Sequence, residues 1–106
     1  MKYTQGDIVR IGDFKNLFLI VSNNAFIRTT GEFHVCPLLD SIPAGPLHIC
    51  ITGITGIKGT AICEQLKLID PAVRRCTKKD RIPYAQMIDI SDAIQGVFEY
   101  DLVSSS

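Results

Sequence analysis

The sequence lacks several features that would assign a protein to a large functional class. Its 11 Lys and Arg balance 11 Asp and Glu, so no field of the whole molecule draws the protein to nucleic acid. No apolar run approaches the roughly 20 residues of a membrane helix. Residues 1–7, MKYTQGD, do not provide the apolar segment of a signal peptide. We therefore expect a cytoplasmic protein with no membrane association.

The four cysteines are not arranged as a metal or redox site. None forms C-x-x-C, and no histidine stands at zinc-ligand spacing from any of them. Cys36, Cys50 and Cys63 lie inside apolar runs, and we predict that they are small buried hydrophobic residues. No metal ion and no cofactor are expected.

The composition is that of one small globular domain. Of the 106 residues, 46% are hydrophobic and 21% are charged, which is typical of a folded chain and leaves too little sequence for two independent cores. We expect residues 1–103 to form this domain and residues 104–106, Ser-Ser-Ser, to be a frayed tail. A core of this size gains from oligomerisation, so we also predict a homodimer.

Short apolar runs separated by turn residues predict a series of strands. Residues 17–21, LFLIV, are typical of a strand that is covered on both faces. We interpret residues 25–31 as a polar connection, and Pro37 indicates an edge strand or a bulge. The predicted strands cover residues 8–11, 17–21, 33–39, 47–51, 60–63 and 66–69, and residues 76–81 are extended at most.

One amphipathic helix is predicted over about residues 83–100, with Pro83 as its first residue. Gly96 weakens such a helix by roughly 1 kcal/mol relative to alanine, so we expect close packing there. The residues expected to form its buried stripe are Met87, Ile90, Ile94, Val97 and Phe98. Short strands followed by one helix predict a mainly β fold, a strongly bent antiparallel sheet or barrel with the helix packed on it.

Charge is separated along the chain although its sum is zero. Residues 58–81 carry seven basic and three acidic side chains, a local excess of four positive charges. The bases are Lys58, Lys67, Arg74, Arg75, Lys78, Lys79 and Arg81. Residues 82–102 carry four acids and no base. The basic region is suited to an anionic partner.

Glu64 is one of the acids in that basic region and is the candidate general base. It lies between the apolar runs 60–63 and 66–69, where partial desolvation would raise the pKa of its carboxyl toward neutrality and neighbouring cations would lower it. A carboxylate among cations is what acid–base chemistry on an anionic substrate requires. A structural ion pair near a strand end is the alternative interpretation.

The two histidines, His34 and His48, both lie in strand-like runs. A hydrogen-bonded histidine of a strand is a sufficient explanation for each. His48 is also a candidate general acid, because it follows the loop at residues 41–46 that should rim the sheet, and a histidine can donate a proton near neutral pH.

Short motifs follow one another along the chain in the order seen in a known protein family. Residues 6–9, GDIV, 19–23, LIVSN, and 35–38, VCPL, resemble its first three strands, and residues 56–70, GIKGTAICEQLKLID, are the most specific match. Residues 72–75 and 79–82 extend the match. The family is the MazF/PemK/Kid toxins of type II toxin–antitoxin modules. The resemblance implies a dimeric SH3-like barrel with a C-terminal helix that cleaves single-stranded RNA without a metal ion.

The same resemblance implies a reaction and its candidate residues. A base takes the proton of the ribose 2′-hydroxyl, and a cationic or hydroxyl group protonates the departing 5′ oxygen, which leaves a 2′,3′-cyclic phosphate. Glu64 falls on an acidic position that acts as the base in some members. The family's arginine before the second strand is replaced by Asn16, with Lys15 beside it, and its threonine by Leu39. The catalytic candidates are Glu64, His48 and Lys15.

RNA binding is assigned to basic and polar residues of the same motifs. These residues are Asn16, Ser41, Lys58, Lys67, Arg74, Arg75, Lys79 and Arg81. The implied partner besides RNA is a small antitoxin whose disordered, acidic tail folds over the RNA site.

Two other functions remain open. A CcdB-like gyrase poison would share the fold, but in that branch a tryptophan-bearing helix end touches the target, and this chain has no Trp. A catalytically inactive relative would keep the dimer surface and bind RNA or a partner without cleavage. The missing arginine and threonine favour this second alternative.

Overall fold

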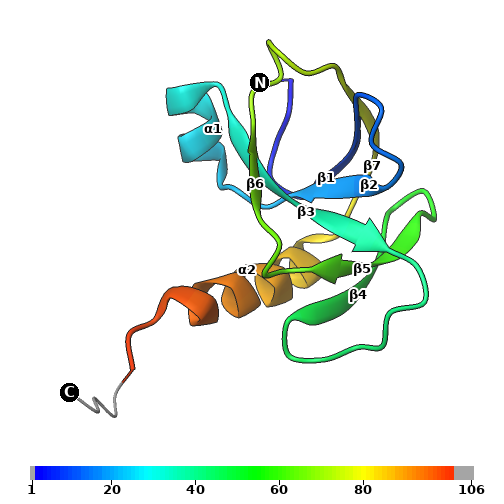
Figure 1. Ribbon diagram of the computed structural model, residues 1–106, viewed down its shortest axis with the longest axis vertical. Coiled ribbons are helices and arrows are strands. Elements are labelled where there is room, and N and C mark those ends of the chain that lie inside the picture. The colour runs from blue at the N-terminus through cyan, green and yellow to red at the C-terminus, as the bar shows by residue number, and fades with distance from the viewer. Residues whose placement is uncertain (1, 102–106) are drawn as a thin grey trace.

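The structure, a computed structural model, describes residues 2–101 and shows a bent sheet with one short and one longer helix (Figure 1). The expected tail at residues 104–106 lies outside the described residues. The strands are β1 Asp7–Ile11, β2 Leu17–Ile20, β3 Phe33–Leu39, β4 His48–Thr52, β5 Lys58–Ile62, β6 Lys67–Ile69 and β7 Cys76–Arg81, and the helices are α1 Asn24–Thr30 and α2 Tyr84–Phe98. The predicted strands are confirmed apart from their ends. Within residues 2–101, neither helix has the length and apolar character needed to cross a membrane.

All seven strands belong to one antiparallel sheet. Its order is β4-β5-β3-β2-β1-β7, and β6 pairs with β3 beyond the end of β5. β4 and β7 are therefore the two edges, and no ladder joins them in the described chain, so the sheet is not closed into the expected barrel. The chain instead turns back after β4. One main-chain hydrogen bond, from Ile54 N to Arg81 O at 2.8 Å, links this turn to β7.

The turn after β4 is held by the buried carboxylate of Asp80 on β7. Asp80 accepts hydrogen bonds from the main-chain N–H groups of Thr55 at 3.0 Å, Ile57 at 3.2 Å and Arg81 at 2.7 Å. A Cβ at Gly53 would clash with this carboxylate, so the close approach requires glycine. Burial raises the pKa of Asp80, but the hydrogen bonds outweigh burial and hold the pKa below its ordinary value.

The sheet carries an apolar cluster on each face, because successive side chains of a strand point to opposite sides. The cluster on the α2 side includes Leu19 and Leu38 of the sheet and Ile90 of the helix. The cluster on the α1 side includes Phe18 and Phe33. Neighbouring residues of β2 thus enter different clusters. This confirms the prediction that the apolar run at residues 17–21 is a strand covered on both faces.

The prediction of an edge position for Pro37 is wrong, because β3 is a central strand. Along one side it pairs with β2, where Pro37 is opposite Phe18. Along the other side it pairs with β6 up to Val35 and with β5 from Leu38. Pro37 therefore lies in the interval between two short partners. Its missing N–H costs no ladder hydrogen bond there.

The interpretation of residues 25–31 as a connection is also wrong, because most of them form α1. The Asn23 side chain accepts a hydrogen bond from Phe26 N at 2.8 Å and caps the first turn. Gly31, with a φ of 73°, ends the helix and donates to Ile27 O. Ile27 is buried in the α1-side cluster. Only the two caps identify this helix in the sequence, because it is too short for a repeating pattern of apolar residues.

The predicted C-terminal helix is confirmed as α2, with Pro83 as its N-cap, but only two of the five residues of the predicted stripe are buried. Met87 and Ile90 are buried, whereas Val97 and Phe98 are 45% and 72% exposed. Burial of the last two was predicted wrongly, because the second half of α2 extends away from the sheet (Figure 1). A Cβ at Gly96 would meet nothing within 4 Å, so the expected close packing is absent from the described chain.

The outer edge of β4 is occupied at both of its ends. The Gln86 side chain of α2 accepts from Thr52 N at 2.9 Å and donates to Thr52 O at 3.2 Å. At the other end, His48 and Gly45 exchange two main-chain hydrogen bonds. The helix and the loop before β4 therefore satisfy main-chain groups that an edge strand usually leaves open.

Candidate functional site

The structure brings together two residues that were proposed separately, His48 and Glu64. His48 is the first residue of β4 and is paired with Ile62, the last residue of β5, and Glu64 lies in the turn that follows. His48 Nε2 lies 3.1 Å from Glu64 Oε2. Both side chains are partly exposed, at 35% and 40%. This His48–Glu64 pair borders a hollow of about 310 Å³ that is completed by Gly45, Pro46 and Leu47.

Of the two opposing effects expected on the pKa of Glu64, the lowering prevails over desolvation, but hydrogen bonds are its main cause. Hydrogen bonding from its own main-chain N–H, and then from His48, lowers the pKa of this carboxyl below its ordinary value, and desolvation opposes this only weakly. The reason is position. Glu64 lies in an exposed turn between two strands, and the apolar residues on either side of it point into the core without covering it.

The His48–Glu64 pair combines the two functions that phosphodiester transfer needs. A carboxylate with a lowered pKa is ionised at neutral pH and accepts a proton or a hydrogen bond, and an imidazole can donate one. Both groups are open to solvent on the same side of the β4–β5 hairpin. A substrate can therefore approach both without a rearrangement of the core.

Ser41 and Lys58 line a second hollow of about 290 Å³ that also includes Cys50 and Thr60. We call it the Cys50 groove. Cys50 is exposed, so its predicted burial is wrong, whereas Cys36 and Cys63 are buried as predicted. The difference follows from β4 being an edge strand, on which Cys50 faces away from the core.

Three predicted RNA-binding cations gather near Phe14, in the turn between β1 and β2. Lys67 Nζ lies 4.8 Å and Arg74 Cζ 5.3 Å from the centre of the Phe14 ring. Arg74 and Arg75 line a hollow of about 470 Å³ beside this ring. Among the described residues none of the three cations is in an ion pair with an acid, so their charge is available to an anion.

The remaining predicted residues are not brought to the His48–Glu64 pair. Lys15 and Asn16 follow Phe14 in the same exposed turn and do not line the hollow at the pair. Lys79 and Arg81 lie on β7, the other edge strand, and line neither that hollow nor the Cys50 groove. The predicted sites thus divide into separate surfaces.

His34 is the hydrogen-bonded strand histidine that the sequence led us to expect. Its Nδ1 lies 3.1 Å from Ser22 Oγ, and its ring packs on Phe26 with the ring centres 5.1 Å apart. Within residues 2–101, no group of three or more His, Cys, Asp or Glu side chains is placed to hold a metal ion.

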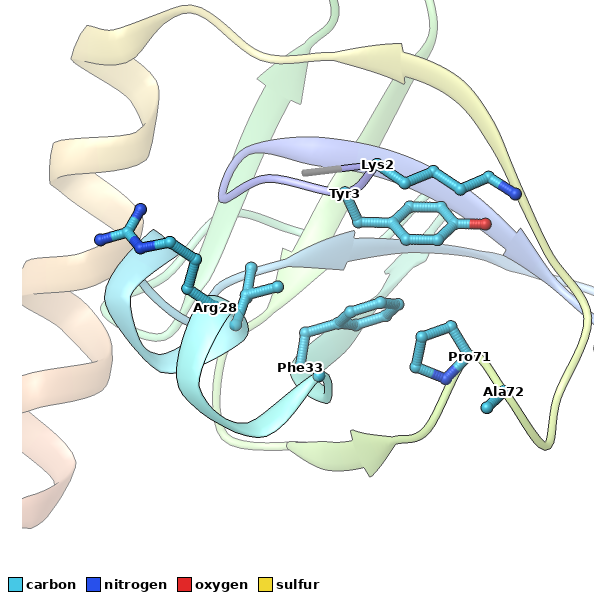
Figure 2. A pocket seen from close by; sticks show the side chains of 8 residues that line it. Lys2, Tyr3, Arg28, Phe33, Pro71 and Ala72 are labelled. Carbon is cyan, nitrogen blue, oxygen red and sulfur yellow. The ribbon is translucent and has the colours of Figure 1, made fainter.

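A further hollow, of about 410 Å³, lies beside α1 and is shown in Figure 2. The rings of Tyr3 and Phe33 form its floor, with their centres 5.3 Å apart. Both rings are at least nine-tenths buried, and the Tyr3 hydroxyl donates to Cys76 O at 2.8 Å. The Arg28 guanidinium points away from the floor (Figure 2). This hollow is the surface of the α1-side cluster and offers no free polar group on its floor.

Phe14, Cys50 and Thr60 line the basic and polar hollows but were not among the predicted site residues. For Cys50 a signal was present. Residues 48–52, HICIT, alternate polar and apolar side chains, which is the pattern of a strand with one face in the core and one face outside. No comparable signal distinguishes Phe14, because a single aromatic residue in a turn has no period.

The fold is similar to that of solved MazF toxins. A MazE–MazF structure from Deinococcus radiodurans aligns with a TM-score of 0.78 at 16% identity, over 93% of this chain and 97% of that chain. An endoribonuclease from a mycobacterial species, in complex with its cognate antitoxin, aligns at 0.77 and 17% identity, over 93% and 99%. The Mycobacterium tuberculosis toxin MazF-mt6 aligns at 0.65 and 14% identity, over 89% and 98%. No family model and no curated protein matches the sequence.

Proposed function

Because the chain has a MazF-like toxin fold, we propose that it is the toxin of a type II toxin–antitoxin pair and an endoribonuclease that acts without a metal ion. A fold alone does not specify an activity. The observation that carries the proposal is the contact of His48 with Glu64, 3.1 Å apart on an exposed face. The proposed substrate is single-stranded RNA, cut at preferred sequences.

In the proposed reaction Glu64 takes the proton of the ribose 2′-hydroxyl, and the 2′ oxygen attacks the adjacent phosphorus. His48 donates a proton to the departing 5′ oxygen, which leaves a 2′,3′-cyclic phosphate and a 5′-hydroxyl. The two side chains contact each other in the free protein and must separate to admit the phosphodiester. A contact between two side chains this exposed is weak, so it opens at little cost.

A second division of labour within the same proposal is that Glu64 orients His48, which then acts as the base. In this version the contact between Nε2 and Oε2 is kept and fixes the ring. Lys15 is a candidate for holding phosphate through the Phe14 turn and not for donating a proton, because it does not line the hollow at the pair.

RNA and the antitoxin are proposed to share the basic surfaces. Lys67, Arg74 and Arg75 form no ion pair in the described chain, and Asp13 is the one acid lining the hollow of the two arginines. A surface with this excess of cations suits both a phosphate backbone and an acidic peptide. The MazF structures similar to this chain include complexes with MazE. We propose the same type of partner here, with the toxin acting as a homodimer in the cytoplasm.

Binding without cleavage is the second candidate function. It is favoured by the replacement of the family's arginine and threonine by Asn16 and Leu39. An inactive relative would keep the basic surfaces and the partner. A CcdB-like gyrase poison is less favoured, because the chain has no Trp for the helix end that touches the target.

The test is cleavage of a mixed-sequence RNA in EDTA by the wild type and by Glu64→Gln. Glu64→Gln keeps the shape of the side chain and removes the proton acceptor, so we expect a loss on the order of 10² to 10⁴ in rate. Asp89→Asn, an exposed change on the first half of α2, is the matched control and should cleave as the wild type does.

Each outcome of this test has a different consequence for the proposal. Equal rates for wild type and Glu64→Gln would remove Glu64 from the mechanism. No cleavage by the wild type, with RNA still bound, would favour the inactive relative, and an assay of gyrase supercoiling then tests the remaining candidate. Circular dichroism and the melting temperature verify that each variant is folded.

A further inference from the structure

The hollow of about 410 Å³ beside α1, which we call the α1 hollow, is lined mainly by apolar side chains (Figure 2). The Tyr3 and Phe33 rings form its floor, and Ile27 and Pro71 also line it. The Tyr3 hydroxyl already donates to Cys76 O, so the floor offers no unused hydrogen-bonding group. A hollow of this volume has room for one large apolar side chain of a partner.

Two cations border this apolar floor. Lys2 and Arg28 line the α1 hollow, and no acid does. Lys2 Nζ lies 5.6 Å from the centre of the Tyr3 ring. Arg28 is in the last turn of α1, and its guanidinium points away from the floor (Figure 2). Neither cation is in an ion pair within residues 2–101, so both are available to acids on a partner.

The turn at residues 71–75 connects the α1 hollow with the hollow beside Phe14. Its first two residues line the former, and its last three line the latter. Burial raises the pKa of the Cys76 thiol, and Arg74 and then Lys2 oppose this, so both cations lie close to the thiol. Four cations and one acid line the two hollows. The two hollows therefore belong to one surface with an excess of positive charge.

Asp70 holds this turn in a fixed conformation. Its carboxylate accepts a hydrogen bond from Ala72 N at 2.9 Å, and its main-chain oxygen accepts from Val73 N and Arg74 N, each at 3.0 Å. A partner therefore binds to a wall that is already formed, which reduces the ordering that binding requires.

We propose that the α1 hollow binds an acidic peptide in extended form, which places one large apolar side chain in it and acidic side chains toward Lys2, Arg28 and Arg74. The inference rests on the proposed function, in which the partner is an acidic peptide, and adds the position at which that partner is anchored. Apolar burial provides the anchor, and the cations on both sides of it select acidic flanks.

The lining of the α1 hollow favours a peptide over RNA. The Tyr3 and Phe33 rings are at least nine-tenths buried, so neither offers an open face on which a base could stack. A base placed there would also bring polar edge groups for which the floor has no partner, and unpaired buried polar groups are costly. An apolar side chain has no such groups.

The α1 hollow is remote from the His48–Glu64 pair. Phe33, on its floor, is the first residue of β3, whereas β5 pairs with Leu38 and Leu39 at the other end of that strand. At roughly 3.3 Å per residue, the two ends of β3 lie about 20 Å apart. A peptide anchored in the hollow therefore binds the protein without filling the space at the pair.

The experiment uses a pool of acidic peptides composed of Asp, Glu, Gly and Ser, in which one central position carries each residue type in turn. A length of about 12 residues is enough to reach from the hollow across the turn, at roughly 3.3 Å per residue. Mass spectrometry compares the pool bound to immobilised wild-type protein with the free pool. We expect Phe, Leu, Ile and Met at the central position to be enriched over Ser by about tenfold or more.

The variant that tests the anchor is Ala72→Phe, which fills the α1 hollow from its rim. It should reduce the enrichment to less than about twofold, while acidic peptides still bind through their charge. Ala85→Phe, the same change at an exposed position of α2, is the matched control and should keep the enrichment. Circular dichroism verifies that both variants are folded.

The variant that tests the charges is Arg28→Gln, which should weaken binding of the whole pool by roughly two- to fivefold without changing the preferred central residue. Arg10→Gln is its matched control. Arg10 is exposed on β1 between Val9 and Ile11, which face the α1 side, so its own side chain lies on the opposite face of the sheet. It should leave binding of the pool unchanged.

The outcomes separate this inference from the proposed function. Enrichment that Ala72→Phe removes supports the anchor even if the wild type cleaves no RNA, in which case only the nuclease proposal fails. No enrichment by the folded wild type, or enrichment that Ala72→Phe leaves intact, overturns the anchor and leaves the nuclease proposal standing.

Two further outcomes would assign the α1 hollow to a different occupant and overturn the peptide. Enrichment that appears only in Phe98→Glu would mean that residues 98–101 of a second copy, Phe-Glu-Tyr-Asp, already fill the hollow. Loss of binding to a single-stranded RNA oligonucleotide in Ala72→Phe, but not in Ala85→Phe, would assign the hollow to RNA.

Discussion

At the scale of single residues, the surroundings of Glu64 determine how its charge depends on pH. Its pKa is lowered from 4.5 by hydrogen bonds from its own N–H and from His48. We expect a titration of the Glu64 carboxyl carbon by nuclear magnetic resonance to give a midpoint below 4.5 in the wild type. In His48→Gln the midpoint should move upward, because one of the two stabilising contacts is weakened.

The contrary result is informative for the mechanism. A midpoint above 4.5 in the wild type would mean that Glu64 is desolvated in solution, as its place between two apolar runs first indicated. His34→Gln is the control, because His34 bonds to Ser22 and makes no contact with Glu64. It should leave the titration unchanged.

Asp80 is a second residue whose charge has a structural effect. It accepts hydrogen bonds from three main-chain N–H groups, two of them in the turn after β4. Asp80→Asn keeps one acceptor oxygen and loses the charge, so we expect the free energy of unfolding at pH 7 to fall by about 1–3 kcal/mol. Chemical denaturation of both proteins measures the difference, with Asp89→Asn on the exposed face of α2 as the control.

The sign of the pH dependence follows from the direction of the shift. The folded-state pKa of Asp80 lies below its ordinary value of 3.8, so its stabilising contribution is present above pH 3.8 and is lost as the pH falls through the folded-state pKa. The difference between wild type and Asp80→Asn should therefore shrink as the pH is lowered toward 2. A constant difference would mean that the charge of Asp80 is not what holds the turn.

The sequence identified His48 and Glu64 as individual candidates, because polar residues beside apolar runs and loops can be recognised without coordinates. It did not indicate that they meet. That contact depends on the register of β4 with β5 and on a turn that projects Glu64 outward. For the same reason the sequence left open whether desolvation or neighbouring groups would decide the pKa of Glu64, since the number of apolar neighbours in sequence says nothing about which way they point.

At the scale of elements, two glycines test how tightly their segments are packed. A Cβ at Gly96 meets nothing within 4 Å, whereas a Cβ at Gly53 would clash with Asp80. We expect Gly96→Ala to raise the free energy of unfolding by up to about 1 kcal/mol through helix propensity, and Gly53→Ala to lower it. Thermal unfolding of both variants provides the comparison. Destabilisation by Gly96→Ala would instead indicate a neighbouring subunit packed on α2.

Elements were predictable where their pattern was long enough to repeat. The apolar run of β2 and the period of α2 could be recognised from sequence, and both elements are present. α1 spans seven residues, which is two helical turns, and only its caps distinguish it from a loop. The exposure of the second half of α2 could not be predicted. Periodicity identifies the apolar face of a helix, but it does not show how far along the helix the sheet extends to cover that face.

At the scale of the whole molecule, that exposed half of α2 bears on assembly. Val97, Phe98 and Tyr100 are 45%, 72% and 85% exposed on or just after a helix that extends away from the sheet (Figure 1). We predict a dimer that buries this surface, with twice the 11.7 kDa mass of the chain in light scattering. Phe98→Glu should give the monomer mass.

Val73→Glu is the matched control, because Val73 is 81% exposed but lies in the turn between β6 and β7. It should remain dimeric. A wild-type monomer at high micromolar concentration, or a dimer that Phe98→Glu leaves intact, would contradict the assignment of this interface.

The contacts at the two ends of the outer edge of β4 affect how a second chain can bind to the molecule. Gln86 and Gly45 occupy the outward main-chain groups at the two ends of this strand. Continuing the sheet there with an additional strand would require both contacts to break first. A peptide or nucleic acid that reaches His48 must therefore lie across the face of the hairpin and contact its side chains, not its edge main-chain groups. The same contacts hinder two copies from pairing edge to edge through β4, so the exposed face of the hairpin can stay polar and open without offering this edge for aggregation.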